Sequence, residues 1–229
     1  ISRQIFPAMF RIFFQMEISG RFHREKLSAD MAREGHILIA NHASHLDAPS
    51  IYAALPKQAR RRMVAAAAKD YFFNSNAKLR HVLLAANLRV FPLERTADPR
   101  DYFTVIAEML DRGDSVLIFP EGTRSRTGAL GTFHPSVGKL IQELSAPVIP
   151  IQIEGTHALW PPNETVPKRG KLKVRFHAPR SFSKRLSPYE ICDRLAALFD
   201  KNQELIQEEV DYGYASKPVF RNRTEGRHC

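Results

Sequence analysis

The chain has 229 residues, 44% of them hydrophobic, which is enough for one α/β domain with a sizeable core. Its net charge of +10 implies an anionic partner, such as nucleic acid, an anionic membrane surface or a phosphorylated substrate. Two cysteines, Cys192 and Cys229, provide neither a disulfide framework nor a cysteine-based metal pattern, and they fit a reducing, cytosol-facing environment.

The N-terminal stretch, residues 5–18, is rich in aromatic and aliphatic side chains. It is too short to span a membrane and lacks the charged start and the cleavage site of a signal peptide. We expect residues 1–19 to form an amphipathic helix that lies in the membrane interface. A helix packed on the core of the domain would give the same pattern, so both interpretations stay open.

The first apolar run, His36–Ala40, predicts a buried strand. Residues 48–55 predict a helix with a proline in its first turn and Asp47 as its N-cap. His42 and Asp47 therefore lie on a strand-to-helix turn, a usual position for chemistry in an α/β protein. On a continuous helix their five-residue spacing would separate them, so their pairing requires the turn. The carboxylate can then accept from one ring nitrogen and leave the other free as a base.

The central segments alternate between strand and helix patterns. We expect strands over residues 63–68, 88–95 and 115–119, and helices over residues 69–87 and 101–112. Gly113 is a plausible stop for the second helix. Because the strand over 115–119 follows at once, the pattern predicts a helix-to-strand unit of a mostly parallel sheet.

The C-terminal segments continue this pattern after a polar loop. We expect a helix over 135–144, a strand over 147–153 whose two prolines suit a sheet edge or a strand start, and a strand over 171–176 with a basic face. A capping box at Ser187–Glu190 opens a helix that we expect to run to about Val210. The fold class predicted is therefore α/β, with a mostly parallel mixed sheet flanked by helices. It forms a single domain over 20–212, before a basic, disordered tail over 213–229.

Two sequence blocks carry the chemistry. The first is Asn-His-Ala-Ser-His-Leu-Asp at residues 41–47, and the second is Phe-Pro-Glu-Gly-Thr-Arg-Ser at residues 119–125. Together they resemble the glycerolipid acyltransferase family, whose blocks of Asn-His, four residues, Asp (the HX4D motif) and of Phe-Pro-Glu-Gly-Thr-Arg-Ser are both present without departure. The resemblance covers about residues 20–180.

The resemblance implies a catalytic pair. His42 takes the proton of the attacking hydroxyl, a role suited to an imidazole at neutral pH, and Asp47 fixes its tautomer and stabilises the imidazolium. The family mechanism is direct attack without an acyl-enzyme, and the lack of a Gly-x-Ser-x-Gly elbow agrees with it. We accordingly expect Ser44 not to be a nucleophile, and His45 to be a structural or surface residue and not a second base.

The resemblance also implies residues that bind the acceptor. Arginine reads phosphate bidentately, and the candidates are Arg124 and, on a looser match to a second family block, Arg95. The remaining candidates are Glu121 for a glycerol hydroxyl, Gly122 for close backbone approach, and Thr123 and Ser125 for phosphate oxygens.

We therefore expect an O-acyltransferase of phospholipid biosynthesis that acylates 1-acylglycerol 3-phosphate to phosphatidate at the cytoplasmic face of a membrane, as a peripheral protein. Acyl-CoA or acyl carrier protein would be the co-substrate, with no cofactor and no metal. Glycerol 3-phosphate or another lysophospholipid are alternative acceptors. A non-catalytic module that binds anionic membranes or nucleic acid is an alternative of another class. The net charge is the sole support for nucleic-acid binding. The signature of such a protein, basic residues interleaved with aromatic residues on one face, is not found in the sequence.

Overall fold

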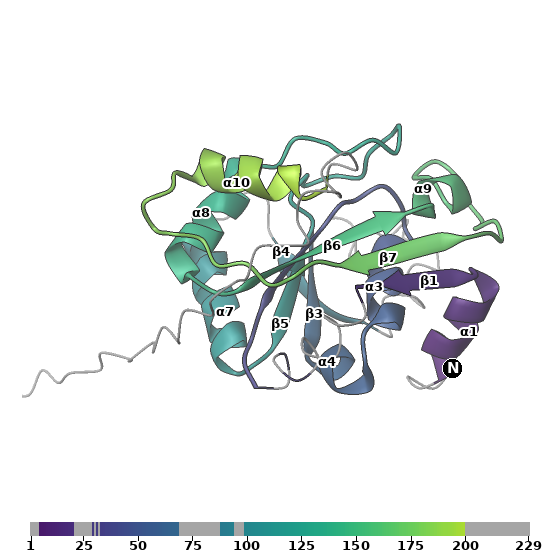
Figure 1. Cartoon of the computed structure of the whole chain (residues 1–229), viewed down its shortest axis with the longest axis horizontal. Helices are drawn as coiled ribbons and strands as arrows, with labels where there is room; N and C mark the ends of the chain where they lie inside the picture. The colour runs from purple at the N-terminus through teal and green to yellow at the C-terminus, as the bar shows by residue number, and fades with distance from the viewer. Residues whose placement is uncertain are drawn as a thin grey trace, which may run out of the picture.

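The computed structural model describes residues 5–20, 29, 31, 33–68, 88–93 and 99–199. In this part of the chain seven strands form one sheet in the order β1-β7-β6-β2-β5-β3-β4 (Figure 1). The strands are β1 (Met16–Ser19), β2 (Ile37–Ala40), β3 (Met63–Ala68), β4 (Arg89–Leu93), β5 (Ser115–Ile118), β6 (Val148–Glu154) and β7 (Leu172–Phe176). Neighbouring strands are parallel except β6 and β7, which are antiparallel. The predicted mostly parallel mixed sheet is confirmed.

Helices cover both faces of this sheet (Figure 1). They are α1 (Ile5–Phe13), α3 (Asp47–Ala54), α4 (Lys57–Arg62), α7 (Pro99–Asp111), α8 (Pro135–Leu144), α9 (Thr156–Leu159) and α10 (Pro188–Ala197). Successive residues of β2 point to opposite faces, so Leu38 packs in the core beneath α1 and α3, while Ile37 packs in the core beneath α7, α8 and α10. Every residue of β2 and of β5 is buried, which explains their continuous apolar runs.

The N-terminal segment differs from the expected helix. α1 ends at Phe13, the chain turns at Gln15 with a φ of 42°, and residues 16–19 form the edge strand β1, which pairs with β7. Glu17 faces Lys173 of β7 across this pair, with 3.5 Å between the charged groups. The expectation of a helix over all of residues 1–19 is therefore wrong, because strand pairing at the sheet edge takes up the second half of the segment.

One side of α1 packs on the domain core. Phe10 and Phe14 are buried and contribute to the same core cluster as the α3 side chains, and Arg11 Nε donates to the Ala53 carbonyl at 2.7 Å. The other side carries apolar side chains that are exposed to solvent, namely Ile5, Met9, Ile12 and Phe13. Packing on the domain core is thus confirmed for one side of α1. Contact of the other side with a membrane stays a prediction.

The proline-containing strand β6 lies inside the sheet, between β7 and β2, and not at an edge as expected. Pro147 does precede the strand, but Pro150 lies within it. The β6–β7 ladder begins only at Ile151, and the Pro150 carbonyl accepts from the His177 amide at 3.0 Å. Because the ladder is interrupted at this point, the missing N–H of proline is tolerated in an interior strand.

Other expected elements appear close to their predicted bounds, including β2, β3, β5, β7, α7 and α8. The capping box at Ser187 is present and opens α10, but this helix ends at Ala197, so the expectation of one helix to about Val210 is wrong. The helix expected over 69–87 and the tail over 213–229 lie outside the described residues.

Candidate active site

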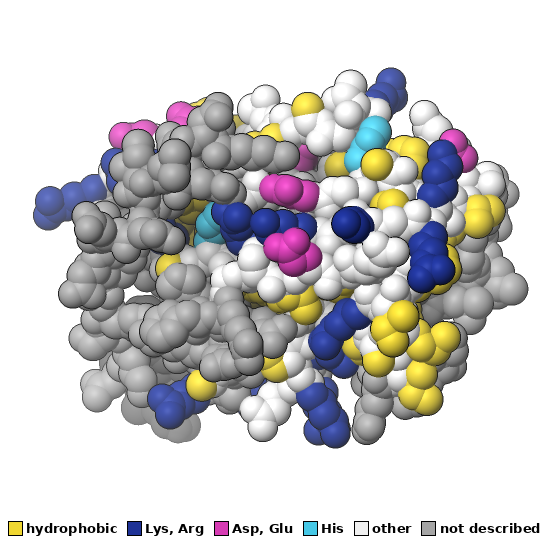
Figure 2. All heavy atoms as spheres, turned by 45° about the vertical axis from the view of Figure 1, so that its right-hand side comes forward, with side chains coloured by type: hydrophobic (Ala, Val, Ile, Leu, Met, Phe, Trp, Pro, Cys, Tyr) yellow, Lys and Arg dark blue, Asp and Glu magenta, His cyan; other side chains and the backbone are white. Residues whose placement is uncertain are grey.

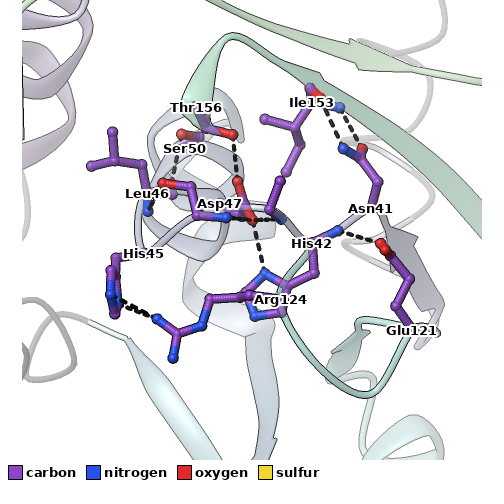
Figure 3. A network of polar contacts seen from close by, with 12 residues as sticks. Asn41, His42, His45, Leu46, Asp47, Ser50, Glu121, Arg124, Ile153 and Thr156 are labelled. Atoms are coloured by element: carbon purple, nitrogen blue, oxygen red, sulfur yellow. Dashed lines mark hydrogen bonds and ion pairs between the residues drawn. The ribbon is translucent and has the colours of Figure 1, made fainter. Parts of the chain in front are cut away.

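The two sequence blocks meet at one edge of the sheet. β2 and β5 are parallel neighbours, so the loops that follow them leave from the same edge. The amide of His42 donates to Glu121 Oε1 at 2.6 Å, and the amide of Ser125 donates to the His42 carbonyl at 2.8 Å. Glu121, 79 positions away in sequence, thus bonds the His42 amide, and Ser125 bonds the His42 carbonyl; Figure 3 draws the contact with Glu121.

His42 and Asp47 form the expected pair. His42 Nδ1 and Asp47 Oδ2 lie 2.8 Å apart, with the Asp47 side chain fully buried and the His42 side chain 21% exposed. Asp47 is the first residue of α3 and not its N-cap, which is Leu46 without a side-chain cap bond. Its carboxylate turns back instead and accepts from the amides of Ala43 and Ser44, each at 2.7 Å.

A fourth donor reaches Asp47 from a distant part of the chain. The Thr156 hydroxyl, on the first residue of α9, donates to Asp47 Oδ1 at 2.6 Å. Both side chains are buried. A buried carboxylate is stable only when its oxygens are hydrogen-bonded, and these donors meet that need.

The His42 ring stacks on Phe119, with ring centroids 3.9 Å apart and planes inclined by 15°. The carboxylate on one ring nitrogen and the aromatic ring on one ring face together restrict the orientation of the imidazole. The hydrogen bond at Nδ1 places the proton there and leaves Nε2 as the basic nitrogen. This arrangement can remove a proton from a hydroxyl group placed near Nε2.

Asn41 ties the end of β2 to β6. Its amide group donates to the Ile153 carbonyl at 2.9 Å and accepts from the Ile153 amide at 2.7 Å (Figure 3). Asn41 and Phe119 lie in the two sequence blocks but had no predicted role. Thr156 lies in neither block, and no sequence signal marked it.

Arg124 directly precedes Ser125, whose amide bonds the His42 carbonyl, so its backbone lies on the loop next to the His42–Asp47 pair. Figure 3 shows its side chain extending toward His45. Its Nη1 atom lies 2.5 and 2.8 Å from the two ring nitrogens of His45. The His45 ring in turn lies 5.1 Å from the Trp160 ring. The structure therefore gives His45 a structural contact, while the other predicted phosphate ligand, Arg95, lies outside the described residues.

Glu121 joins the two loops of the site. Besides the His42 amide, its carboxylate accepts from the Gly131 amide at 2.8 Å. Burial raises the pKa of Glu121, and the hydrogen bonds from the His42 and Gly131 amides oppose that rise. Each carboxylate oxygen of Glu121 accepts from a backbone amide, and contact with a glycerol hydroxyl stays a prediction.

The remaining residues of the second block form an exposed turn. Gly122 has a φ of 67°, and a Cβ there would meet no atom within 4 Å, so the backbone conformation, not lack of space, favours glycine. Thr123 is exposed, and the Ser125 hydroxyl accepts from the Gly128 amide at 3.0 Å. Roles of these three residues in acceptor binding stay predictions.

Ser44 is buried and hydrogen-bonded at both ends of its hydroxyl. Its side chain is 1% exposed, and its hydroxyl donates to the Trp160 carbonyl at 2.6 Å and accepts from the Leu46 amide at 3.1 Å. A serine held in this way is not available as a nucleophile. Across the described residues, no group of three His, Cys, Asp or Glu side chains is arranged to hold a metal ion.

Comparisons with known proteins identify the family of the chain. The model of the family described as Acyltransferase matches residues 19–154. The chain is 37% identical over 94 residues to 1-acyl-sn-glycerol-3-phosphate acyltransferase BAT2, chloroplastic, of Brassica napus, covering 39% of this chain and 27% of that protein. It is 30% identical over 133 residues to lyso-ornithine lipid O-acyltransferase of Pseudomonas aeruginosa, covering 56% and 46%. The chain spans less than half the length of these curated relatives.

Among solved structures, the fold is similar to that of the 1-acyl-sn-glycerophosphate (LPA) acyltransferase PlsC from Thermotoga maritima. The TM-score is 0.62 at 20% sequence identity, with 90% of this chain and 82% of that chain covered. At this identity the likeness establishes the fold alone.

Proposed function

This chain belongs to the Acyltransferase family, and from that premise we propose that it transfers a fatty acyl group from a thioester to the free hydroxyl of 1-acylglycerol 3-phosphate, giving phosphatidate. The donor is acyl-CoA or an acylated carrier protein, and no further cofactor takes part. The observation that carries this proposal is the buried Asp47 carboxylate, which holds the partly exposed His42 ring with Nε2 as its basic nitrogen.

The reaction proceeds by direct attack. Nε2 of His42 accepts the hydroxyl proton while the hydroxyl oxygen bonds to the thioester carbonyl carbon, and Asp47 stabilises the resulting imidazolium. The tetrahedral intermediate collapses with cleavage of the C–S bond, and the leaving thiolate takes the proton back from the imidazolium. The ester and the free thiol are the products, and the base is restored.

Arg124 binds the acceptor phosphate in this proposal. Its guanidinium contacts His45, three positions after His42 in the same loop, so a phosphate held there would place the lipid hydroxyl close to the base (Figure 3). Arg95, Glu121, Gly122, Thr123 and Ser125 are further candidates for acceptor binding.

The acceptor class has an alternative with specific support. A relative at 30% identity is named a lyso-ornithine lipid O-acyltransferase, and that name describes a lysolipid acceptor other than lysophosphatidate. Glycerol 3-phosphate is a third acceptor that the same site chemistry would serve. An acceptor without a phosphate would depend less on Arg124.

We also propose that the protein works at a membrane surface, at the cytoplasmic face, with α1 as the contact. The exposed side of α1 carries Ile5, Met9, Ile12 and Phe13, and the chain is strongly basic. Figure 2, which brings the side of α1 and β7 toward the viewer, shows hydrophobic side chains gathered together with Lys and Arg side chains nearby. Among the described helices, none has the length and apolar character needed to cross a bilayer.

The first experiment measures acyl transfer by the purified chain from oleoyl-CoA to lysophosphatidate in detergent, following thiol release and phosphatidate mass. We expect His42→Ala to lower the rate at least about 10³-fold, since the base and its orienting carboxylate act as a unit. Equal rates in the two proteins would refute the assignment.

A second set of variants tests acceptor binding. Arg124→Ala should raise the KM for lysophosphatidate more than the KM for oleoyl-CoA, and Arg126→Ala, which changes an exposed arginine of the same loop, is the matched control. Lysophosphatidate, glycerol 3-phosphate and a lyso-ornithine lipid, compared as acceptors, identify the substrate class. Oleoyl-CoA and oleoyl-acyl carrier protein, compared as donors, identify the thioester.

A further inference from the structure

Thr156 contacts Asp47 from a part of the chain that is distant in sequence. It follows β6 directly, after Gly155 with a φ of 85°, and its hydroxyl lies 2.6 Å from Asp47 Oδ1, 109 positions away. The side chain is 1% exposed. The turn at Gly155 therefore delivers a buried hydroxyl from the β6 side of the sheet to a carboxylate at the start of α3.

The two oxygens of Asp47 have different partners. Oδ2 accepts from His42 Nδ1 and from the amides of Ala43 and Ser44, all of which belong to the loop before α3. Oδ1 accepts from the Thr156 hydroxyl, and among the described residues no other donor to this oxygen is seen. The local loop thus holds one oxygen, and Thr156 holds the other, which fixes the plane of the carboxylate.

A donor at Oδ1 also alters the charge that His42 meets. A hydrogen bond to a carboxylate favours its charged form and draws negative charge toward the donor. Without the Thr156 hydroxyl, more of that charge would lie on Oδ2, beside the imidazole, and the carboxylate could rotate away from the loop amides. The imidazolium would then be held more tightly and the neutral base would be less available at a given pH.

We propose that Thr156 is a positioning residue of the acyl-transfer site: its hydroxyl sets the plane and the charge of the Asp47 carboxylate, and through it the orientation and basicity of His42. The consequence for turnover rests on the proposed function, whereas the consequence for the His42 ring does not. A purely architectural role, in which Thr156 only anchors α9 to α3, is the competing explanation.

The kinetic test compares Thr156→Val, which removes the hydroxyl and keeps the shape, with Thr156→Ser, which keeps the hydroxyl. We expect Thr156→Val to lower kcat about 10-fold, with both KM values within about twofold of the parent. The acid limb of its kcat/KM profile should move to higher pH, and Thr156→Ser should restore both readouts. Ser50→Ala is the control, because it removes another buried hydroxyl, which lies on α3 with Asp47 but donates to the Leu46 carbonyl.

The independent test follows the His42 ring by NMR in protein labelled at histidine, with His42→Ala to assign the signal. The charged or titratable groups near this ring, among the described residues, are Asp47, Glu121, Arg124 and His45. The substitutions at Thr156 and Ser50 leave these four residues unchanged in sequence. We expect the titration midpoint of the ring to be higher in Thr156→Val than in the parent and to return in Thr156→Ser.

The outcomes separate the two proposals. If the parent protein shows no acyl transfer, the proposed function fails, while the NMR comparison still decides the role of Thr156. An unchanged titration midpoint in Thr156→Val would overturn the positioning role even if kcat falls. Failure of Thr156→Ser to restore the midpoint would do the same. If Thr156→Val does not fold, Thr156→Ala replaces it in the same comparison.

Discussion

Asp47 carries its charge in a fully buried position because the protein supplies hydrogen bonds to both oxygens. Three of them come from residues within five positions of it, and one comes from Thr156. The local bonds follow from the tight loop before α3, so a short sequence block contains most of what is needed to aim His42. The last bond depends on how β6 packs, which no local pattern encodes.

The pair should behave as one unit in mutational kinetics. We expect Asp47→Asn to lower kcat about 10³-fold, because an amide cannot both hold the Nδ1 proton and accept from the loop amides as the carboxylate does. The double variant His42→Ala/Asp47→Asn should be no slower than His42→Ala alone. Steady-state rates of the three variants test this, and multiplicative losses would show that the two side chains act separately.

Glu121 should make stability depend on pH. Burial raises its pKa above the ordinary value of 4.5, so the folded state binds the proton more tightly than the unfolded state does. The stabilisation from protonated Glu121 is therefore complete below about pH 4.5 and is lost as pH rises through the raised pKa. Glu121→Gln lacks this titration.

Urea unfolding of both proteins at several pH values measures the effect. The free energy of unfolding of the parent, relative to Glu121→Gln, should decrease as pH rises across that interval, while the other titrating groups cancel in the difference. Parallel curves for the two proteins would contradict the prediction.

At the scale of helices and strands, sequence patterns predicted most elements because hydrophobic periodicity and capping residues act locally. The capping box of α10 and the continuous apolar runs of β2 and β5 are examples. Strand pairing is not local, and this explains the two main errors. β1 is a strand because β7 lies beside it, and Pro150 is tolerated inside the sheet because the opposite ladder is interrupted there.

The contact between α8 and α10 depends on a glycine. A Cβ at Gly138 would lie 2.0 Å from the Pro188 carbonyl oxygen, which is rigid backbone. We expect Gly138→Ala to destabilise the fold by about 1–3 kcal/mol, although alanine is the better helix former, because the two helices must separate.

Lys139→Ala, at the next position of α8, is the matched control. Its ammonium pairs with Glu143 on the exposed helix surface, and loss of such a solvent-screened pair should leave stability almost unchanged. Urea unfolding measures both variants. Equal stabilities of Gly138→Ala and the parent would show that the helices can adjust without cost.

At the scale of the whole molecule, α1 has two sides with different surroundings. One side completes the core with Phe10, together with Phe14 just after the helix, and the other exposes Ile12, at 73%, and Met9, at 55%. The sequence predicted the amphipathic pattern but could not say which side met the protein, because core packing and membrane insertion both select apolar side chains.

Vesicle binding tests the outer side of α1. We expect Ile12→Ser to weaken binding to phosphatidylcholine vesicles that contain phosphatidylglycerol by about 10-fold, the loss from leaving one large apolar side chain out of the bilayer. Added salt should weaken binding of the parent as well. Tyr189→Ser, an equally exposed apolar change on α10, is the control, and sedimentation with vesicles is the measurement. If Ile12→Ser and Tyr189→Ser weakened vesicle binding equally, the outer side of α1 would not be the membrane contact.

The polar network of Figure 3 sets a lower limit on how short a working version of this protein can be. The part of the chain that matches the family ends at residue 154. A fragment cut there would keep both His42 and Asp47 but lose Thr156, the Trp160 carbonyl that accepts from the Ser44 hydroxyl, and the strand β7 that lies between β6 and β1. On a ribosome the same limit acts in time, since the imidazole cannot be aligned by this network until the chain has been made past residue 160.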